Sequence, residues 1–216
     1  MKVGIVGAGN VGKALAKSSV RAGHEVRISA RHREHAEAAA KEAGARGAGS
    51  NQDVVRQSDV VILAVPYPTL DEVIGDARRE LRDKIIVDVT NPLKQDYSGL
   101  ATFGTSAAEQ IQSKVPGARV VKAFNTVLAS RQADPHVDGT AADAFVAAND
   151  DEAKARVLDL ARSMGFRPID CGGLQMARHL ESLAFLNIAL QMRHGWPWQA
   201  AWKLVGPTPE RARKAA

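Results

Sequence analysis

The chain has 216 residues, with 29 Lys or Arg against 24 Asp or Glu, and a net charge of +5. Its 45% hydrophobic and 25% charged residues are typical of a globular protein with one full core. No apolar run is long enough for a membrane span, and sparse aromatics with scattered basic residues argue against a nucleic-acid partner. The chain starts directly in a strand and has one cysteine, Cys171, so we expect a cytoplasmic protein without signal peptide or internal disulfide.

The first thirty residues predict a strand, a glycine-rich turn and a helix. Residues 3–6 are a β-branched run, and residues 11–22 have helical spacing that ends at Gly23. Between them lies Gly7-Ala8-Gly9-Asn10-Val11-Gly12, the G-x-G-x-x-G pattern of a dinucleotide-binding turn. The first glycine permits the turn, the second lets a pyrophosphate approach the backbone, and the third lets the helix pack on the sheet. We therefore expect a dinucleotide site here.

The end of the second predicted strand, residues 25–29, indicates which dinucleotide binds. An NAD site needs a carboxylate about twenty residues beyond the turn, where it accepts a hydrogen bond from the ribose 2′-OH. Here Ser29, Arg31 and His32 follow the strand, and no acidic residue comes before Glu34. A hydroxyl and a guanidinium group suit a 2′-phosphate, so NADP is preferred over NAD. The alternative is a basic surface loop that leads into an Ala-rich helix at 34–43.

The next stretch continues the alternation of strands and helices. Strands are expected at 59–65, 84–89 and 119–124, helices at 51–57, 69–81 and 106–114, and loops at 44–50 and 94–105. Val65, Pro66 and Tyr67 end one strand, where they either cover a cofactor or form a stiff connection. Asn91 follows another strand, where its side chain either binds ribose or amide groups or caps the loop.

The last third of the chain predicts fewer elements. Residues 131–142 are expected to be an irregular loop, followed by a strand at 143–148, a helix at 150–164, a strand at 166–170 and a helix at 174–194. One stripe is expected along that last helix, formed by Leu180, Leu183, Leu186/Asn187 and Leu190. We expect the tryptophans that follow, Trp196, Trp198 and Trp202, either to pack a final helix against the protein or to form a dimer contact.

These elements predict an α/β fold of the Rossmann type, with a doubly wound, mostly parallel sheet and a small C-terminal helical extension. Residues 1–170 would form the NADP-binding domain. Residues 171–216 would form a helical segment that completes the substrate pocket and contributes a dimer contact.

Several segments together resemble the F420-dependent NADP oxidoreductase family over nearly the whole chain. They are the glycine turn, Ser29-Ala-Arg31, Thr90-Asn-Pro-Leu93, Lys122-Ala-Phe-Asn-Thr126, Gly165-Phe-Arg-Pro-Ile-Asp170, Gly172-Gly-Leu and Ala177-Arg-His-Leu-Glu-Ser-Leu183. The related NADPH-binding domain of six-transmembrane ferric reductases carries the same Lys-Ala-Phe-Asn-Thr segment. Two departures concern the second substrate: archaeal F420 members have His-Thr in place of Asn125-Thr126, and Pro-Leu-Ser in place of Gly173-Leu174-Gln175.

The resemblance implies hydride transfer between NADP(H) and the deazaflavin F420 or a flavin (FMN or FAD), in a homodimeric enzyme without metal or catalytic side chain. The implied NADP site comprises Gly7, Ala8, Gly9, Asn10, Val11, Gly12, Ser29, Arg31, His32, Val65, Pro66, Tyr67 and Asn91. The implied second site comprises Asn125, Thr126, Ala129, Gly173 and Leu174. Direct transfer between two stacked rings needs alignment and exclusion of water more than an acid or base.

Two other functions fit part of the sequence. A β-hydroxyacid dehydrogenase or imine reductase needs a proton donor, usually Lys or Asp on a long helix, and residues 174–194 contain neither, which leaves Arg178, His179 or Glu181. A non-catalytic NADP sensor would use the same glycine turn and no second substrate. Arg178 either holds an anionic substrate or pairs with Glu181 at i+3, and the pairing is preferred. Cys171 either borders the pocket or, as we expect, is a small buried filler.

Overall fold

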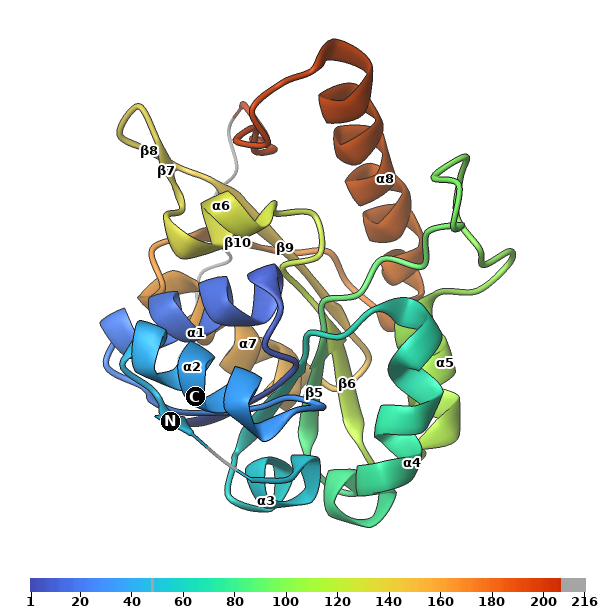
Figure 1. Ribbon diagram of the computed structural model, residues 1–216. Helices are drawn as coiled ribbons and strands as arrows, with labels where there is room; N and C mark the ends of the chain where they lie inside the picture. Colours follow the sequence, from blue (N-terminus) through green and yellow to red (C-terminus); the bar gives the residue numbers. More distant parts are fainter. Residues whose placement is uncertain (48, 207–216) are drawn as a thin grey trace, which may run out of the picture.

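The computed structural model describes residues 1–47 and 49–206, which form a twisted sheet between two layers of helices (Figure 1). The order of strands in the sheet is β10-β9-β6-β5-β4-β1-β2-β3. Their bounds are β1 Lys2–Val6, β2 Glu25–Ser29, β3 Arg46–Gly47, β4 Val60–Leu63, β5 Ile85–Asp88, β6 Arg119–Lys122, β9 Asp143–Ala148 and β10 Arg167–Asp170. β1 to β6 are parallel, whereas β9 runs antiparallel to β6 and parallel to β10. The Rossmann-type, mostly parallel sheet is therefore confirmed.

Successive residues of each buried strand face opposite layers, which gives the sheet a separate core on each side. Ile5, Ile62 and Val87 pack under α1 (Asn10–Arg21), α2 (Arg33–Ala43) and α7 (Asp151–Ser163). On the other face lie Val61, Leu63 and Ile86. That face is covered by α3 (Asn51–Arg56), α4 (Leu70–Leu81), α5 (Ala107–Lys114) and the start of α8 (Ala177–His194). Short 3₁₀ turns, η1 (Tyr67–Thr69) and η2 (Leu174–Met176), precede α4 and α8.

Most predicted elements are found within two or three residues of their expected bounds, and three segments differ. The loop at 44–50 contains the short edge strand β3. The irregular loop at 131–142 contains the end of α6 (Ala129–Ala133) and a hairpin, β7 (His136–Val137) with β8 (Thr140–Ala141), whose turn has positive φ at Asp138 and Gly139. The strand expected to reach 124 stops at Lys122, because Phe124 turns the chain in a left-handed conformation with φ of 59°.

The predicted stripe of the last helix is found only in part, since Leu180 and Asn187 are buried and the other leucines are not. The face that α8 buries combines apolar and polar side chains, namely Ala177, Leu180, Glu181, Ala184, Asn187 and Gln191. Leu186 is 48% exposed instead, and Leu183 and Leu190 are only half-buried. Glu181 and Gln191 fix part of this face through partners outside the helix. Glu181 accepts from Lys122 and from the Ala107 amide, and Gln191 Oε1 accepts from the Trp198 amide.

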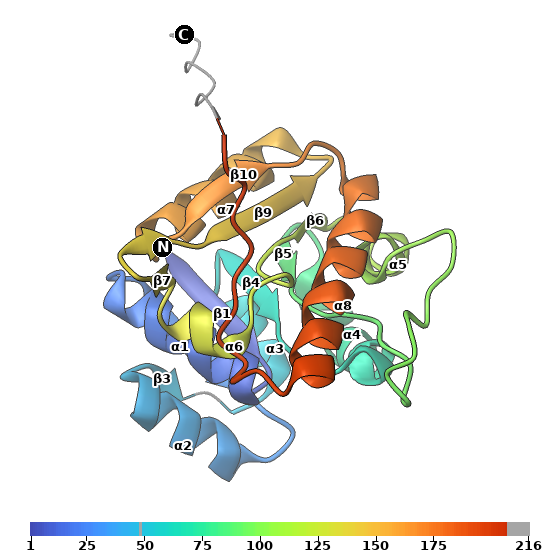
Figure 2. The ribbon, with the colours of Figure 1, turned by 90° about the horizontal axis from the view of Figure 1, so that it is seen from above.

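After α8 the chain returns across the molecule as an extended strap rather than as a helix, up to residue 206 (Figure 2). Ser130 Oγ donates to the Trp198 carbonyl at 2.5 Å, and Asp143 N donates to the Trp202 carbonyl at 3.2 Å. The strap thereby ties the far end of α8 to α6 and β9. The basic tail residues Arg211, Arg213 and Lys214 lie outside the described residues. No described helix combines the length and apolarity that crossing a bilayer requires.

Candidate functional site

A cleft of about 680 Å³ opens at the carboxyl ends of β1, β2 and β4. The strand order reverses there, because β2 and β3 lie on one side of β1 whereas β4 and the strands after it lie on the other. Open α/β sheets bind ligands at such a point. The lining residues are Val6, Gly7, Ala8, Gly9, Ala30, Arg31, Gly49, Ser50, Asn51, Gln52, Ala64, Val65, Pro66, Thr69, Glu72, Val73 and Asp76.

The three glycines of the turn differ in what surrounds them. Gly7 has a φ of 115°, and a Cβ there would lie 2.2 Å from the Ala64 carbonyl oxygen. A Cβ at Gly12 would lie 1.9 Å from the Gly7 oxygen, so both positions are closed to side chains. Gly9 faces open space, since no described atom lies within 4 Å of the position that its Cβ would take. Within the described part of the chain, no side chain caps the start of α1 at Asn10, so the amides of its first turn are free to bind an anion.

Arg31 extends over the cleft from the end of β2. Its Nη2 donates to both carboxylate oxygens of Glu72 on α4, at 3.1 and 2.7 Å. Ser29 is fully buried, and its hydroxyl donates to Asn51 Oδ1 at 2.8 Å, so it reaches the cleft through Asn51 rather than directly. His32 is the exposed N-cap residue of α2 and lies outside the lining of the cleft.

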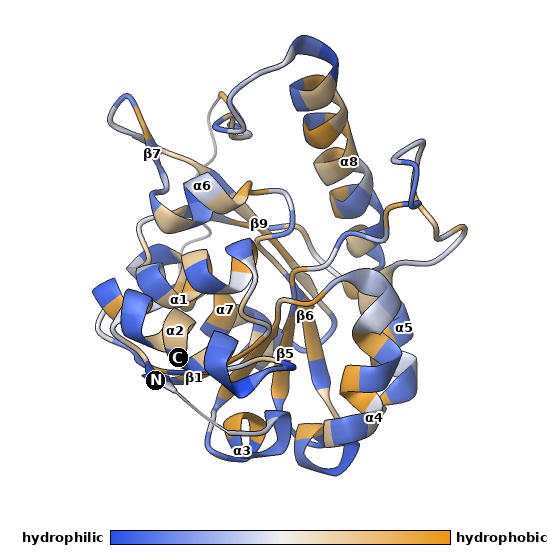
Figure 3. Ribbon diagram, viewed as in Figure 1, coloured by the Kyte–Doolittle hydropathy of each residue, from blue (hydrophilic) through white to orange (hydrophobic). Residues whose placement is uncertain are grey.

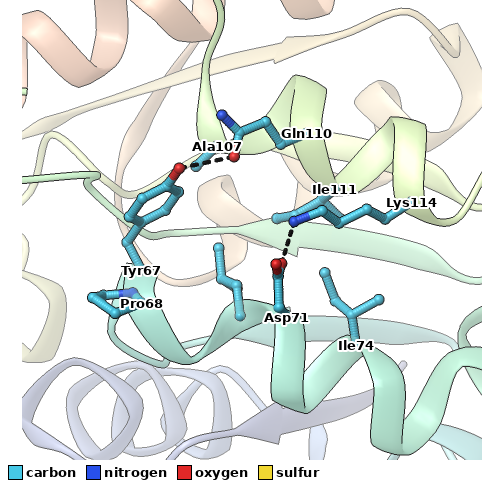
Figure 4. A pocket seen from close by; sticks show the side chains of 9 residues that line it. Tyr67, Pro68, Asp71, Ile74, Ala107, Gln110, Ile111 and Lys114 are labelled. Carbon is cyan, nitrogen blue, oxygen red and sulfur yellow. Dashed lines mark hydrogen bonds and ion pairs between the residues drawn. The ribbon is translucent and has the colours of Figure 1, made fainter. Parts of the chain in front are cut away.

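Tyr67 points away from the cleft, although Val65 and Pro66 line it. Its hydroxyl donates to Gln110 Oε1 at 2.9 Å, across a small pocket between α4 and α5 (Figure 4). Lys114 and Asp71 form an ion pair at the other side of this pocket. Tyr67 therefore braces α5 in this structure, and a contact of its ring with a cofactor stays a prediction.

Two asparagines join the ends of β5 and β6 to α8. Asn91 Nδ2 donates to the Asn125 carbonyl at 2.9 Å, and Asn125 Nδ2 donates to Asn91 Oδ1 at 2.9 Å and to the Leu180 carbonyl at 3.0 Å. The Asn91 amide is thus used within the protein. Among the described residues, five buried side-chain atoms have no hydrogen-bond partner, and Asn125 Oδ1 and Thr126 Oγ1 are two of them.

A fully buried ionic cluster lies beneath these asparagines. All three donors of the Lys122 ammonium are used, by Asp88 Oδ2 at 2.8 Å, Glu181 Oε1 at 2.8 Å and the Thr90 carbonyl at 2.6 Å. Glu181 Oε1 also accepts from the backbone amide of Ala107, the first residue of α5. Burial raises the pKa of Glu181, and the charge of Lys122 opposes that rise. Sequence reasoning missed this cluster, although a lysine directly after Val120 and Val121 in a strand predicted to be buried was the available signal.

The structure does not bring all residues of the expected second site together. Asn125, Thr126 and Ala129 follow β6 at the carboxyl edge of the parallel strands. β10, which precedes Gly173, runs antiparallel to β6. Ala148 on β9 pairs with Val121 on β6, and the Ala148 amide donates to the Gly172 carbonyl. Gly173 and Leu174 are therefore level with the middle of β6.

The surroundings of Gly173 and Leu174 are those of structural residues. Leu174 is 2% exposed in the core under α5, and its amide donates to Asn149 Oδ1 at 2.8 Å. A Cβ on Gly173 would lie 3.3 Å from the same Asn149 oxygen. Enlarging Gly173 would therefore disturb this loop. The part of α8 that contacts Asn125 is its first turns, through the Leu180 carbonyl, rather than Gly173 or Leu174.

The chain is similar to known proteins over most of its length. Residues 2–92 match the model of the family described as "NADP oxidoreductase coenzyme F420-dependent". The F420-dependent NADP reductase of Methanocaldococcus jannaschii is 34% identical over 213 residues, which cover 90% of this chain and 94% of that protein.

This chain belongs to the F420-dependent NADP oxidoreductase family. A solved structure described as a putative F420-dependent NADP-reductase from Arthrobacter sp. FB24 superposes on this chain with a TM-score of 0.83 at 31% identity. The match covers 94% of this chain and 100% of the Arthrobacter chain. Metalloreductase STEAP3 of Rattus norvegicus is 32% identical over 183 residues, or 84% of this chain and 36% of that protein. The expected resemblance to both groups is therefore confirmed.

An imine reductase from Myxococcus stipitatus shares the fold of this chain, with a TM-score of 0.67 at 17% identity. The match covers 90% of this chain and 62% of the imine reductase chain.

Two of the three side chains considered above as substitute proton donors are engaged in ion pairs. Arg178 donates to both Glu109 oxygens at 2.8 and 2.6 Å, so its expected pairing with Glu181 is wrong. Glu181 is held in the buried cluster, and His179, the third, is exposed on the surface of α8.

Cys171 fits the role of a filler. It is half-buried, its Sγ lies 3.7 Å from the Ile169 carbonyl oxygen, and burial raises the pKa of its thiol. A raised pKa keeps the sulfur in its less reactive protonated form.

Proposed function

We propose that this protein transfers a hydride between NADPH and the deazaflavin F420. The observation that carries the proposal is the cleft itself, in which an open Gly9 at the start of α1 and Arg31 at the end of β2 stand where a pyrophosphate and a 2′-phosphate bind in this fold. The name of the M. jannaschii relative, an F420-dependent NADP reductase, supports F420 as the acceptor.

The residues present fit NADP. At Gly7 and Gly12 a Cβ would collide with backbone carbonyl oxygens, so glycine keeps the turn tight, while Gly9 leaves room for phosphate oxygens against the backbone. Arg31 supplies a fork of donors for the 2′-phosphate, and Asn51, oriented by Ser29, lines the same end of the cleft. When bound, the nicotinamide ring supplies the hydride.

The protein's own contribution to the reaction is to hold and align the two ring systems and to exclude water. The Asn91–Asn125 pair and the Leu180 carbonyl join the segments that follow β5 and β6 to α8. This arrangement requires no side-chain acid or base. Arg178 and Glu181 are both engaged in ion pairs.

An absorbance assay tests the reaction directly. Purified protein is given NADPH with F420, FMN or FAD in turn, and NADPH consumption is followed. Turnover with F420 alone supports the proposal. Turnover with FMN or FAD instead would assign the protein to flavin reduction, and binding of NADPH without consumption by any of the three would contradict hydride transfer to these acceptors.

We also propose that the protein is a cytoplasmic homodimer in which α8 forms part of the contact. Leu186 is 48% exposed and Met192 52%, and Trp196 beyond the helix is 43% exposed. Apolar residues recur along the whole of α8, beyond the turns that pack on the core (Figure 3). Sedimentation velocity should give about twice the chain mass of 23.0 kDa, and Leu186→Glu should lower that mass. A wild-type species of monomer mass would contradict the proposal.

A further inference from the structure

The wall of the cleft opposite Arg31 carries two carboxylates. Glu72 and Asp76 are four residues apart on α4, which places them on one face of the helix, and both line the cleft. Asp76 is satisfied by neighbouring amides, since Asn51 Nδ2 donates to it at 3.1 Å and Gln52 Nε2 at 2.6 Å. Glu72 instead accepts from Arg31, the cation that the proposed function assigns to the 2′-phosphate.

Helix stability does not explain why Glu72 faces the cleft. An acid in the first turn of α4 is favourable because of the helix dipole, but Asp71 provides the same benefit and pairs with Lys114 across the small pocket between α4 and α5 (Figure 4). The Arg31 and Glu72 side chains are 68% and 65% exposed, and such exposed ion pairs contribute only about 0–1 kcal/mol to folding. Glu72 therefore affects the cleft more than the fold.

A bound 2′-phosphate would have to share Arg31 with Glu72 or displace Glu72 from it. Both Glu72 oxygens accept from Nη2 alone, so a phosphate either uses the other N–H donors of the guanidinium or takes Nη2 from the carboxylate. In both cases the carboxylate stays on the cleft wall, where it repels the added negative charge. A ligand that lacks the 2′-phosphate meets neither cost.

We propose that Glu72 is a specificity-determining residue, which competes with the 2′-phosphate of NADP for Arg31 and so lowers the preference of the cleft for NADP over NAD. This inference rests on the proposed function only in assigning Arg31 to the 2′-phosphate. It concerns binding and does not depend on the hydride acceptor.

The test is calorimetric binding of two fragments that differ only by the phosphate in question, adenosine 2′,5′-bisphosphate and 5′-AMP. We expect Glu72→Gln to bind the bisphosphate about 3- to 10-fold more tightly, where fivefold corresponds to about 1 kcal/mol, with 5′-AMP changed less than about twofold. Asp71→Asn is the matched control, because it removes the same charge from the adjacent residue and should change neither affinity. The gain should shrink in high salt, since the groups are exposed.

A double-mutant cycle shows whether the effect acts through Arg31. In an Arg31→Ala background, Glu72→Gln should no longer favour the bisphosphate by the same factor. Weaker or unchanged binding of the bisphosphate to Glu72→Gln would overturn the inference, since Glu72 would then orient Arg31 or have no influence. The proposed NADP preference fails separately, and the inference with it, if Arg31→Ala alone leaves the affinity for the bisphosphate unchanged.

Discussion

Arg31→Ala is expected to weaken NADPH binding by about 10- to 100-fold, the loss that follows from removing a charge-assisted hydrogen bond of about 1.5–3 kcal/mol. NADH should bind nearly as before, because it lacks the 2′-phosphate and β2 is followed by no carboxylate that would select its 2′-OH. The measurement is a fluorescence titration of the variant with each reduced nucleotide. Loss of the Arg31–Glu72 ion pair itself should hardly affect folding, because both groups are exposed.

Arg33→Ala is the matched control for this prediction. Arg33 lies two residues further on, but its Nε donates to Glu37 on the surface of α2, outside the lining of the cleft. The variant should therefore leave both affinities unchanged. Equal losses of NADPH and NADH affinity in Arg31→Ala would contradict the assignment of this residue to the 2′-phosphate.

Lys122→Met is expected to lower the free energy of unfolding by about 3–5 kcal/mol, since it leaves Asp88 and Glu181 buried without their shared cation. Methionine keeps most of the side-chain volume, so the decrease in the free energy of unfolding reflects the missing charge rather than a cavity. Urea unfolding followed by circular dichroism measures it. The control is Lys114→Met, which removes a lysine from the partly exposed pair with Asp71 and should cost less than about 1 kcal/mol.

The stability loss in Lys122→Met should also depend on pH. Burial already raises the pKa of Glu181, and removal of Lys122 removes the charge that opposes the rise. A carboxyl group whose folded pKa exceeds its unfolded pKa gives stability that is complete below the unfolded pKa and is lost as the pH rises through the folded pKa. The deficit should therefore be larger at about pH 8 than at about pH 5. A deficit independent of pH, or no deficit, would show that the cluster does not hold its charges as the distances indicate.

The glycine turn shows how much of this protein follows from local sequence. Gly7, Gly9 and Gly12 stand between a β-branched strand and a helix, and close packing and backbone conformation alone dictate glycine at the first and third positions. The same holds for the alternation of strands and helices up to β6, because the hydrophobic period of each segment reflects its own burial. The parallel sheet, its cleft and the basic end of β2 could therefore be predicted without coordinates.

Side-chain partners distant in the sequence could not be predicted in the same way. Arg178 pairs with Glu109 rather than Glu181 because α5 packs beside α8, and Glu181 is instead turned toward Lys122. Tyr67 follows a strand end, where a cofactor contact is expected, yet its hydroxyl is bonded to Gln110 on α5. No local period or spacing encodes such pairings.

The sequence by itself determined the Rossmann-type sheet, the position of the cleft at the glycine turn and the presence of Arg31 beside it. Only the tertiary structure decided which side chains reach that cleft, which face of α8 is buried and how Lys122, Asp88 and Glu181 meet. The physical reason is that strand and helix formation depends on neighbours along the chain. A buried charge or amide must find its partner wherever the packed elements bring one within hydrogen-bonding distance.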